Sequence, residues 1–153
     1  MPSSEYFAGH FDGEGCVYMK PHNKGYRLIV AVCACHYPVL VAYQQTFSGS
    51  IRPRLDGARN KPMWEWYLHT QPKCLSFLTA IELYSLEKRE QIHIALAWLH
   101  QRLALPKRTR VPDSFISFGH ECDKQLRILK RQPFTQPEST PVAPQTAVES
   151  RLL

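Results

Sequence analysis

The stretch at residues 7–15, which reads FAGHFDGEG, constrains the fold of this chain more than any other part of the sequence. Gly9 and Gly13 are four residues apart, so in a helix they lie on one face, about one turn apart. A helix face without side chains allows a second helix to approach backbone to backbone. Asp12 and Glu14 follow at the end of the helix, where we expect both carboxylates to leave the core together. Because the chain holds a single copy of the stretch, we expect two chains to pair around a two-fold axis.

The remaining sequence alternates between strand and helix patterns, judged from the spacing of its apolar residues. The predicted elements are a helix at 4–12, strands at 16–22 and 26–35, a helix at 38–47, strands at 50–55 and 63–70, and helices at 72–83, at 86–103 and from 113 onward. We expect turns at 23–25 and 56–60, and a cap on the last helix from Asp113. The order predicts an α+β domain at residues 1–132, followed by a Pro-rich disordered tail at 133–153.

The charge balance and the cysteines indicate the class of partner and compartment. Nineteen Lys and Arg against 13 Asp and Glu give a net charge of +6, which makes nucleic acid a candidate partner. The five cysteines show no disulfide-framework spacing and sit mostly among apolar neighbours. No apolar run reaches the length of a membrane span, and no secretory signal is visible. We therefore expect no membrane association and a reducing intracellular setting, either a prokaryotic cytoplasm or an organelle matrix, and not secretion.

Residues 7–15 resemble the LAGLIDADG motif of homing endonucleases, and the element order resembles the αββαββα core of that family over about residues 4–103. Residues 112–129 resemble the C-terminal helical region of its small, single-motif members. The resemblance implies a saddle-shaped antiparallel sheet with additional C-terminal helices, and a homodimer. It also implies an intron-encoded, Mg²⁺-dependent enzyme that makes a double-strand break in a long pseudopalindromic DNA target. His10 departs from the family pattern, which usually has an apolar residue at this interface position.

The resemblance also assigns the metal site. The second acidic position, Glu14, would hold Mg²⁺ together with the backbone carbonyl of Gly13, with two or more ions per dimer, whereas Asp12 would cap or orient. Two Glu14 carboxylates across a dimer axis would repel each other unless cations bridge them. Mg²⁺ suits a site of carboxylate, water and phosphate oxygens. The alternative is an amphipathic helix that ends at glycine and whose acidic residues are simply solvated.

Two further residues are catalytic candidates by alignment with the family. Lys88 stands in the family's aromatic-x-x-x-Lys-x-x-Gln setting, and His36 stands at the end of the second strand. Lys88 also fits a charged first turn on a solvated helix face, and His36 also fits an ordinary strand end. Zinc bound by Cys33, Cys35 and His36 is disfavoured, because alternation along a strand puts the two cysteines on one face and His36 on the other.

Alternation along the strands predicts a sheet face rich in basic and aromatic side chains. Arg52 and Arg54 share this face and could read guanine, whereas Lys24 and Arg108 suit phosphate contacts, as do Arg59 and Lys61. Taken singly, each of these residues also fits a solvated surface charge. The predicted DNA contacts are Lys20, His22, Lys24, Arg27, Arg52, Arg54, Glu65, Tyr67 and Arg108. The predicted dimer interface consists of Phe7, Gly9, His10 and Gly13.

A second function fits the same residues. A nucleic-acid-binding protein of this fold could act without cleavage, either as an intron RNA maturase or as a DNA-binding regulator. Glu14 favours the endonuclease, because a protein that only binds has no need of an acidic residue at a crowded two-fold axis.

Overall fold

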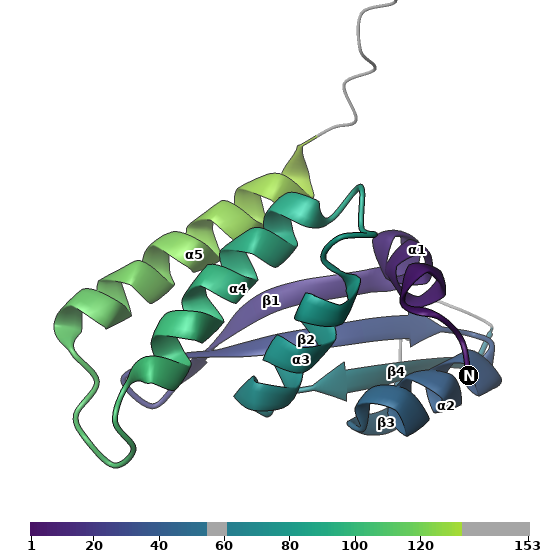
Figure 1. Cartoon of the computed structure of the whole chain (residues 1–153), viewed down its shortest axis with the longest axis horizontal. Coiled ribbons are helices and arrows are strands. Elements are labelled where there is room, and N and C mark those ends of the chain that lie inside the picture. Colours follow the sequence, from purple (N-terminus) through teal and green to yellow (C-terminus); the bar gives the residue numbers. More distant parts are fainter. Residues whose placement is uncertain (55–60, 133–153) are drawn as a thin grey trace, which may run out of the picture.

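The computed structural model describes residues 1–54 and 61–132 of the 153-residue chain. Its elements run α1 (Ser4–Glu14), β1 (Gly15–His22), β2 (Gly25–Ala34), α2 (Tyr37–Phe47), β3 (Ser50–Arg54), β4 (Met63–Leu68), α3 (Gln71–Ile81), α4 (Arg89–Ala104) and α5 (Asp113–Arg131) (Figure 1). The α+β class and the predicted element order are confirmed. The predicted turn at 56–60, Arg59 and the tail at 133–153 lie outside the described residues.

The four strands form one antiparallel sheet in the order β1-β2-β4-β3. Strand β1 pairs along its whole length with β2, from Gly15 opposite Val32 to His22 opposite Gly25. Every second residue of β2 is fully buried on one face, at Leu28, Val30 and Val32. This alternation was predicted, and it divides the sheet into a face that packs on helices and a face that does not.

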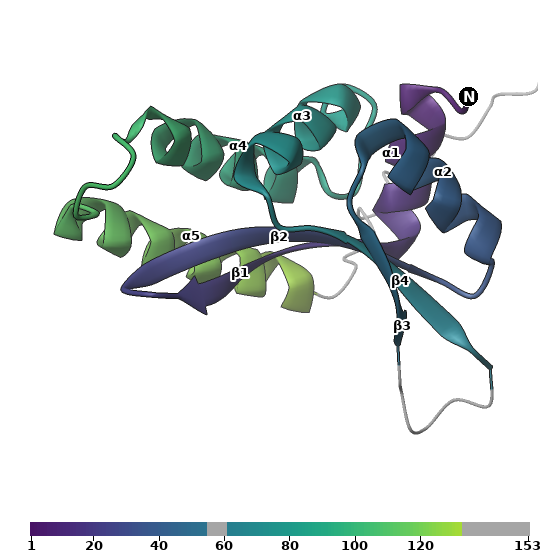
Figure 2. The same ribbon diagram turned by 90° about the horizontal axis from the view of Figure 1, so that it is seen from below.

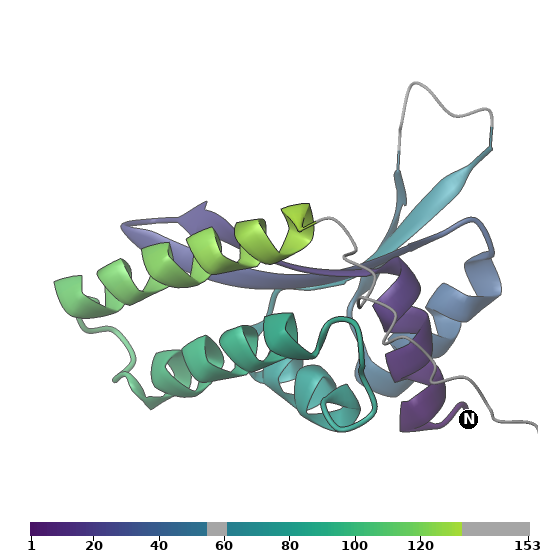
Figure 3. The ribbon, with the colours of Figure 1, turned by 90° about the horizontal axis from the view of Figure 1, so that it is seen from above.

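Four of the five helices that the structure describes form a layer against the apolar face of the sheet (Figure 2). Helices α1 to α4 cover that face, whereas α5 lies beside α4 and runs along the β1 edge (Figures 1 and 3). Figure 2 shows β3 and β4 curving away from the helical layer. No helix among the described residues has both the length and the apolar character needed to cross a lipid bilayer.

An aromatic cluster joins α1 to the rest of the core. Phe7 is fully buried, with its ring centroid 4.7 Å from that of Tyr43 and 5.0 Å from that of Phe47. Phe11 packs edge-on against Phe77 at 5.3 Å. The prediction that Phe7 lies at a dimer interface is therefore wrong, because its side chain is enclosed within its own chain.

Some details of the helices and of the core differ from the prediction for identifiable reasons. Helix α4 begins at Arg89 and not at residue 86, because the backbone amides of residues 86–88 donate to Asp12. Helix α5 has Asp113 as its first residue and Pro112 before it, with no side-chain cap, so the predicted Asp113 cap is wrong. Trp64 shares a strand face with the fully buried Trp66 but is itself only half-buried, and it packs edge-on against the exposed Tyr37 ring.

Candidate nucleic-acid interface and active site

The end of α1 is tied to the loop before α4 by the carboxylate of Asp12. This carboxylate accepts hydrogen bonds from the Ser85 hydroxyl and from the backbone amides of Leu86, Glu87 and Lys88. Burial alone raises the pKa of Asp12, but these hydrogen bonds together lower it below its ordinary value of 3.8. Asp12 therefore orients the chain, as predicted. The expectation that it leaves the core beside Glu14 is wrong, since Asp12 is 9% exposed.

Lys88 is held at the same end of α1. Its ammonium group donates to the backbone carbonyl of Asp12, and its own amide donates to the Asp12 carboxylate at 3.2 Å. The last carbonyls of a helix carry partial negative charge, so a cation is favoured at this position. Lys88, which follows Asp12 by 76 positions in the sequence, thus lies beside the two residues that end α1, Gly13 and Glu14.

Glu14 is exposed, and its carboxylate makes no hydrogen bond or ion pair with any other described residue. An unpaired carboxylate at the carbonyl end of a helix, with the Gly13 carbonyl beside it, offers the oxygen ligands that Mg²⁺ prefers. Within residues 1–54 and 61–132, no three His, Cys, Asp or Glu side chains are grouped to hold a metal. Glu14 and the Gly13 carbonyl could therefore supply only part of the ligand set of a Mg²⁺ ion.

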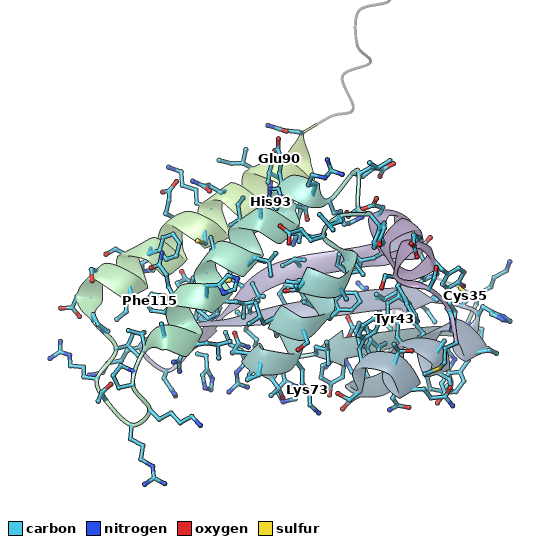
Figure 4. All side chains as sticks on the ribbon, in the orientation of Figure 1. Cys35, Tyr43, Lys73, Glu90, His93 and Phe115 are labelled. Atoms are coloured by element: carbon cyan, nitrogen blue, oxygen red, sulfur yellow. The ribbon has the colours of Figure 1, made fainter. Side chains whose placement is uncertain are left out.

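His36 lies at the same end of the sheet as Glu14. It immediately precedes α2, is exposed, and makes no capping hydrogen bond. The register places Val32 opposite Gly15, so the chain that leaves β2 passes beside the start of β1. Cys35 is also exposed and marks this corner in Figure 4 (Figure 4).

The outer face of α1 carries Gly9 and Gly13. Both are exposed, and a Cβ atom placed on either would meet no other atom within 4 Å. His10 lies beside this face, half-buried, with Nδ1 3.2 Å from the Tyr43 hydroxyl. Burial raises the pKa of Tyr43, so its hydroxyl stays protonated and donates to the Phe7 carbonyl at 3.1 Å. The His10 nitrogen must then be the donor to Tyr43, which fixes the tautomer of the neutral ring.

A groove of about 300 Å³ crosses the sheet face that the helices leave open. Five of the predicted DNA contacts line it together: Lys20, His22, Arg27, Arg52 and Tyr67. They come from all four strands, and the three on β1 and β2 lie near the turn that joins those two strands. The Nε2 atom of His22 accepts a hydrogen bond from Arg27 at 2.8 Å, so the neutral ring is anchored next to the cation.

Arg52 is held in place by two neighbours on the open face. Its guanidinium donates to one Glu65 oxygen at 2.5 and 2.6 Å and lies 4.6 Å from the centre of the Tyr67 ring. The Arg52 side chain is 55% exposed, whereas that of Glu65 is 11% exposed. Glu65 therefore positions Arg52 and does not itself offer a free carboxylate. Arg54, on the same face, donates to the Cys33 sulfur at 2.9 Å.

Comparison with solved structures identifies the fold. The homing endonuclease I-CvuI, solved in complex with its target, superposes with a TM-score of 0.69 at 18% identity, over 88% of this chain and 85% of that one. An archaeal intron-encoded homing endonuclease complexed with DNA gives a TM-score of 0.69 at 10% identity, over 88% of both chains. This chain has the LAGLIDADG homing endonuclease fold. No family profile and no curated protein matches its sequence.

The LAGLIDADG fold also occurs in longer chains. The LAGLIDADG meganuclease I-AabMI, bound to uncleaved DNA, superposes with a TM-score of 0.63 at 12% identity, over 80% of this chain but 44% of that one. The present chain thus corresponds to less than half of that meganuclease. Its described residues include one glycine-faced helix and one open sheet.

Within the LAGLIDADG fold the predicted site residues fall into separate groups. Gly13, Glu14 and Lys88 lie together at the end of α1, whereas His36 lies just before α2 at the same end of the sheet. The groove residues line the open face. Lys24 lies in the β1–β2 turn and Arg108 in the connection between α4 and α5. These two residues are therefore at the opposite end of β1 from Glu14 and cannot belong to the same centre.

Two aromatic residues that line the groove are absent from the predicted DNA contacts, Tyr18 and His69. The Tyr18 ring lies 5.6 Å from the Lys130 ammonium of α5, and the His69 ring stacks on Tyr67 at 5.9 Å. Tyr18 was detectable, because it alternates with Lys20 on one strand face. His69 lies two residues after Tyr67, but it follows the end of β4, where the alternation of a strand no longer predicts the direction of a side chain.

Proposed function

We propose that this chain is a site-specific DNA endonuclease that acts as a homodimer and uses Mg²⁺ to make a double-strand break in a long pseudopalindromic target. The observation that carries the proposal is the placement of Glu14. Its unpaired carboxylate ends a helix whose outer face is bare glycine, with Lys88 held beside it. The fold it shares with DNA-bound homing endonucleases supports the same conclusion.

The chain's own residues supply binding and orientation. The open sheet face presents a groove lined by Lys20, Arg27 and Arg52, which suits the phosphates and base edges of duplex DNA. Lys88 holds a positive charge where the scissile phosphate must lie, and Asp12 fixes the loop from which Lys88 projects. Glu14 and the Gly13 carbonyl would hold Mg²⁺. When bound, Mg²⁺ supplies charge neutralisation at the phosphate and a water of lowered pKa.

The homodimer is proposed because a single chain leaves the glycine face of α1 uncovered. A Cβ added at Gly9 or Gly13 would contact no packed neighbour among the described residues, and glycine in a helix costs stability relative to alanine. Close approach of a second α1 gives the glycines a reason to be there and brings two Glu14 carboxylates together. A meganuclease of which this chain covers only 44% has the length for two such units.

The decisive experiment separates binding from cleavage. A duplex library is selected for binding in Ca²⁺, and the selected duplexes are then incubated with protein in Mg²⁺. Wild type should bind and cut, whereas Glu14→Gln, which keeps the shape but loses the charge, should bind and not cut. Glu90→Gln is the matched control, because Glu90 is an exposed carboxylate on α4 and should cut as wild type does (Figure 4).

Two outcomes would refute the proposal. If Glu14→Gln cuts at the wild-type rate, Glu14 is not the metal ligand. If wild type binds tightly and never cuts in Mg²⁺, the chain is a binding protein of the same fold, and intron RNA then becomes the ligand to test next. If the wild-type protein cuts as a monomer, only the homodimer part of the proposal is refuted.

A further inference from the structure

A second cavity lies at the far end of the molecule from Glu14. It has a volume of about 380 Å³ and lies between the β1–β2 turn, α4, the connection after α4, and α5. The eight residues of β1 separate it from the end of α1, which at about 3.3 Å per residue is about 25 Å. Its volume falls in the range of about 300–1,000 Å³ that is usual for small-molecule sites.

The inner wall of the cavity is aromatic. Tyr26 from β2, Trp98 from α4 and Phe115 from α5 line it, and the Trp98 and Phe115 rings lie 5.5 Å apart. Phe115 is labelled in Figure 4, at the end of α5 that follows the connection from α4 (Figure 4). Gly119 forms part of the same wall, where a Cβ would come within 2.9 Å of the Tyr26 ring. Three aromatic side chains around one space suit a flat, apolar ligand.

One wall residue has an unused hydrogen-bond donor. Trp98 is 1% exposed, and its indole Nε1 has no hydrogen-bond partner in the described part of the chain. Buried N–H groups are almost always paired, because leaving one unpaired forfeits the hydrogen bond it would make in water. An acceptor on a ligand in this cavity would satisfy the Trp98 indole.

The rim of the cavity is cationic. Lys24, Arg102 and Arg110 line it, against a single acidic residue, Asp113. Arg110 reaches Asp113 at 3.5 Å, but Arg102 is half-buried and makes no hydrogen bond or ion pair with the described residues. A guanidinium without a partner among the described residues, beside an aromatic wall, suits an anionic group, and phosphate, like carboxylate, can accept two parallel hydrogen bonds from arginine.

We propose that this cavity binds a nucleoside monophosphate, with its base among Tyr26, Trp98 and Phe115 and its phosphate at Arg102 and Lys24. Two sources carry the same chemistry: a free nucleotide, or a nucleotide at the end of a bound DNA strand. His22 lines both this cavity and the groove on the open face, so the two sites adjoin. The cavity is separate from the Glu14 centre and does not depend on cleavage.

Binding can be measured on the full chain without DNA by titration calorimetry with AMP, and with adenosine and inorganic phosphate as probes of each half. We expect one saturable AMP site per chain and at least about tenfold weaker binding of adenosine and of phosphate. Arg102→Ala should weaken AMP binding about tenfold, and Trp98→Phe several-fold, because phenylalanine keeps an aromatic wall but lacks the N–H. Arg127→Ala, on the exposed pair with Asp123, is the matched control and should bind as wild type does.

The remaining measurements identify the source of the nucleotide and check that the variants are folded. If AMP binds equally well in the presence of saturating duplex DNA, the ligand is a free nucleotide; if a duplex with an unpaired end nucleotide displaces AMP and a blunt duplex does not, it is a strand end. Gly119→Ala should block AMP, and circular dichroism melts show which variants remain folded. The proposal is overturned if wild type shows no saturable AMP binding at millimolar concentration. It is also overturned if phosphate binds as well as AMP, or if Arg102→Ala and Trp98→Phe both bind as wild type does.

Discussion

Gly9→Ala distinguishes an α1 that faces solvent from an α1 that faces a second chain, because the two cases predict opposite signs. Within one chain, the added Cβ has no atom within 4 Å, so nothing opposes it. Alanine in a helix interior is more stable than glycine by about 0.8–1.0 kcal/mol. For a chain of this size that gain raises the melting temperature by about 2–4 °C. A monomer should therefore become more stable.

In a dimer that packs α1 against its partner, the same methyl group lies between two backbones. Overpacking of a close contact costs about 1–3 kcal/mol. Since about 1.4 kcal/mol is tenfold in an equilibrium constant, the dissociation constant of the dimer should rise about 5- to 150-fold. Gly9→Leu should dissociate the dimer further. DNA cleavage should fall with the dimer, because the proposed metal site brings the Glu14 carboxylates of both chains together.

The assay is sedimentation equilibrium over a range of protein concentrations, with thermal melts at low and high concentration. Thr79→Ala is the matched control, since Thr79 is an exposed helical residue on α3 and also gains helix propensity. It should raise the melting temperature and leave the dimer unchanged. If Gly9→Ala behaves in the same way as Thr79→Ala, the glycine face of α1 is not the interface.

Three further results are expected. Asp12→Ala should lose about 1–3 kcal/mol of unfolding free energy, because it leaves buried donors unpaired. Since the folded pKa of Asp12 is lowered, wild type should also lose stability as pH falls below about 4, and Asp12→Asn should show a shallower loss. Urea titration measures both effects. Glu65→Gln should relax base preference at one symmetric pair of target positions, where Arg52 reads, by a factor of about 5–150 in a profile of all single-base variants; a uniform loss would make Arg52 a phosphate anchor. Burial lowers the pKa of His10 below 6.5 although Glu14 opposes the shift, so the folded chain should lose stability as pH falls from about 6.5 through that lowered value. Urea titration of His10→Leu should show no such contribution.

Local periodicity was enough to predict the element order and the two faces of the sheet. It succeeded because a helix repeats every 3.6 residues and a strand every two, so Leu28, Val30 and Val32 on one side and Arg27 on the other follow from spacing alone. Periodicity failed to predict burial where burial depends on how much of a helix face the rest of the chain covers. Phe7 is apolar both at an interface and in a core, and only the positions of Tyr43 and Phe47 decide between the two.

The site was predictable only as far as its residues lie close together in sequence or match the family pattern. Glu14 and Gly13 adjoin in the chain, and Lys88 was found through the resemblance. The burial of Asp12 depends on donors 73 to 76 residues away, which no local pattern reveals. The cavity beside Trp98 escaped notice for the same reason, although Gly119 within an otherwise regular helix was a usable signal of close packing.

The edge strand β3 has a consequence for how this protein stays dispersed. Its outer edge faces no other described strand, and such edges invite pairing with another chain and aggregation. Pro53 sits in the middle of β3 between Arg52 and Arg54, and proline has no N–H to offer a neighbouring strand. The two arginines add charge to the same edge. Replacing either arginine with an apolar residue to retarget the protein would therefore also weaken its protection against aggregation.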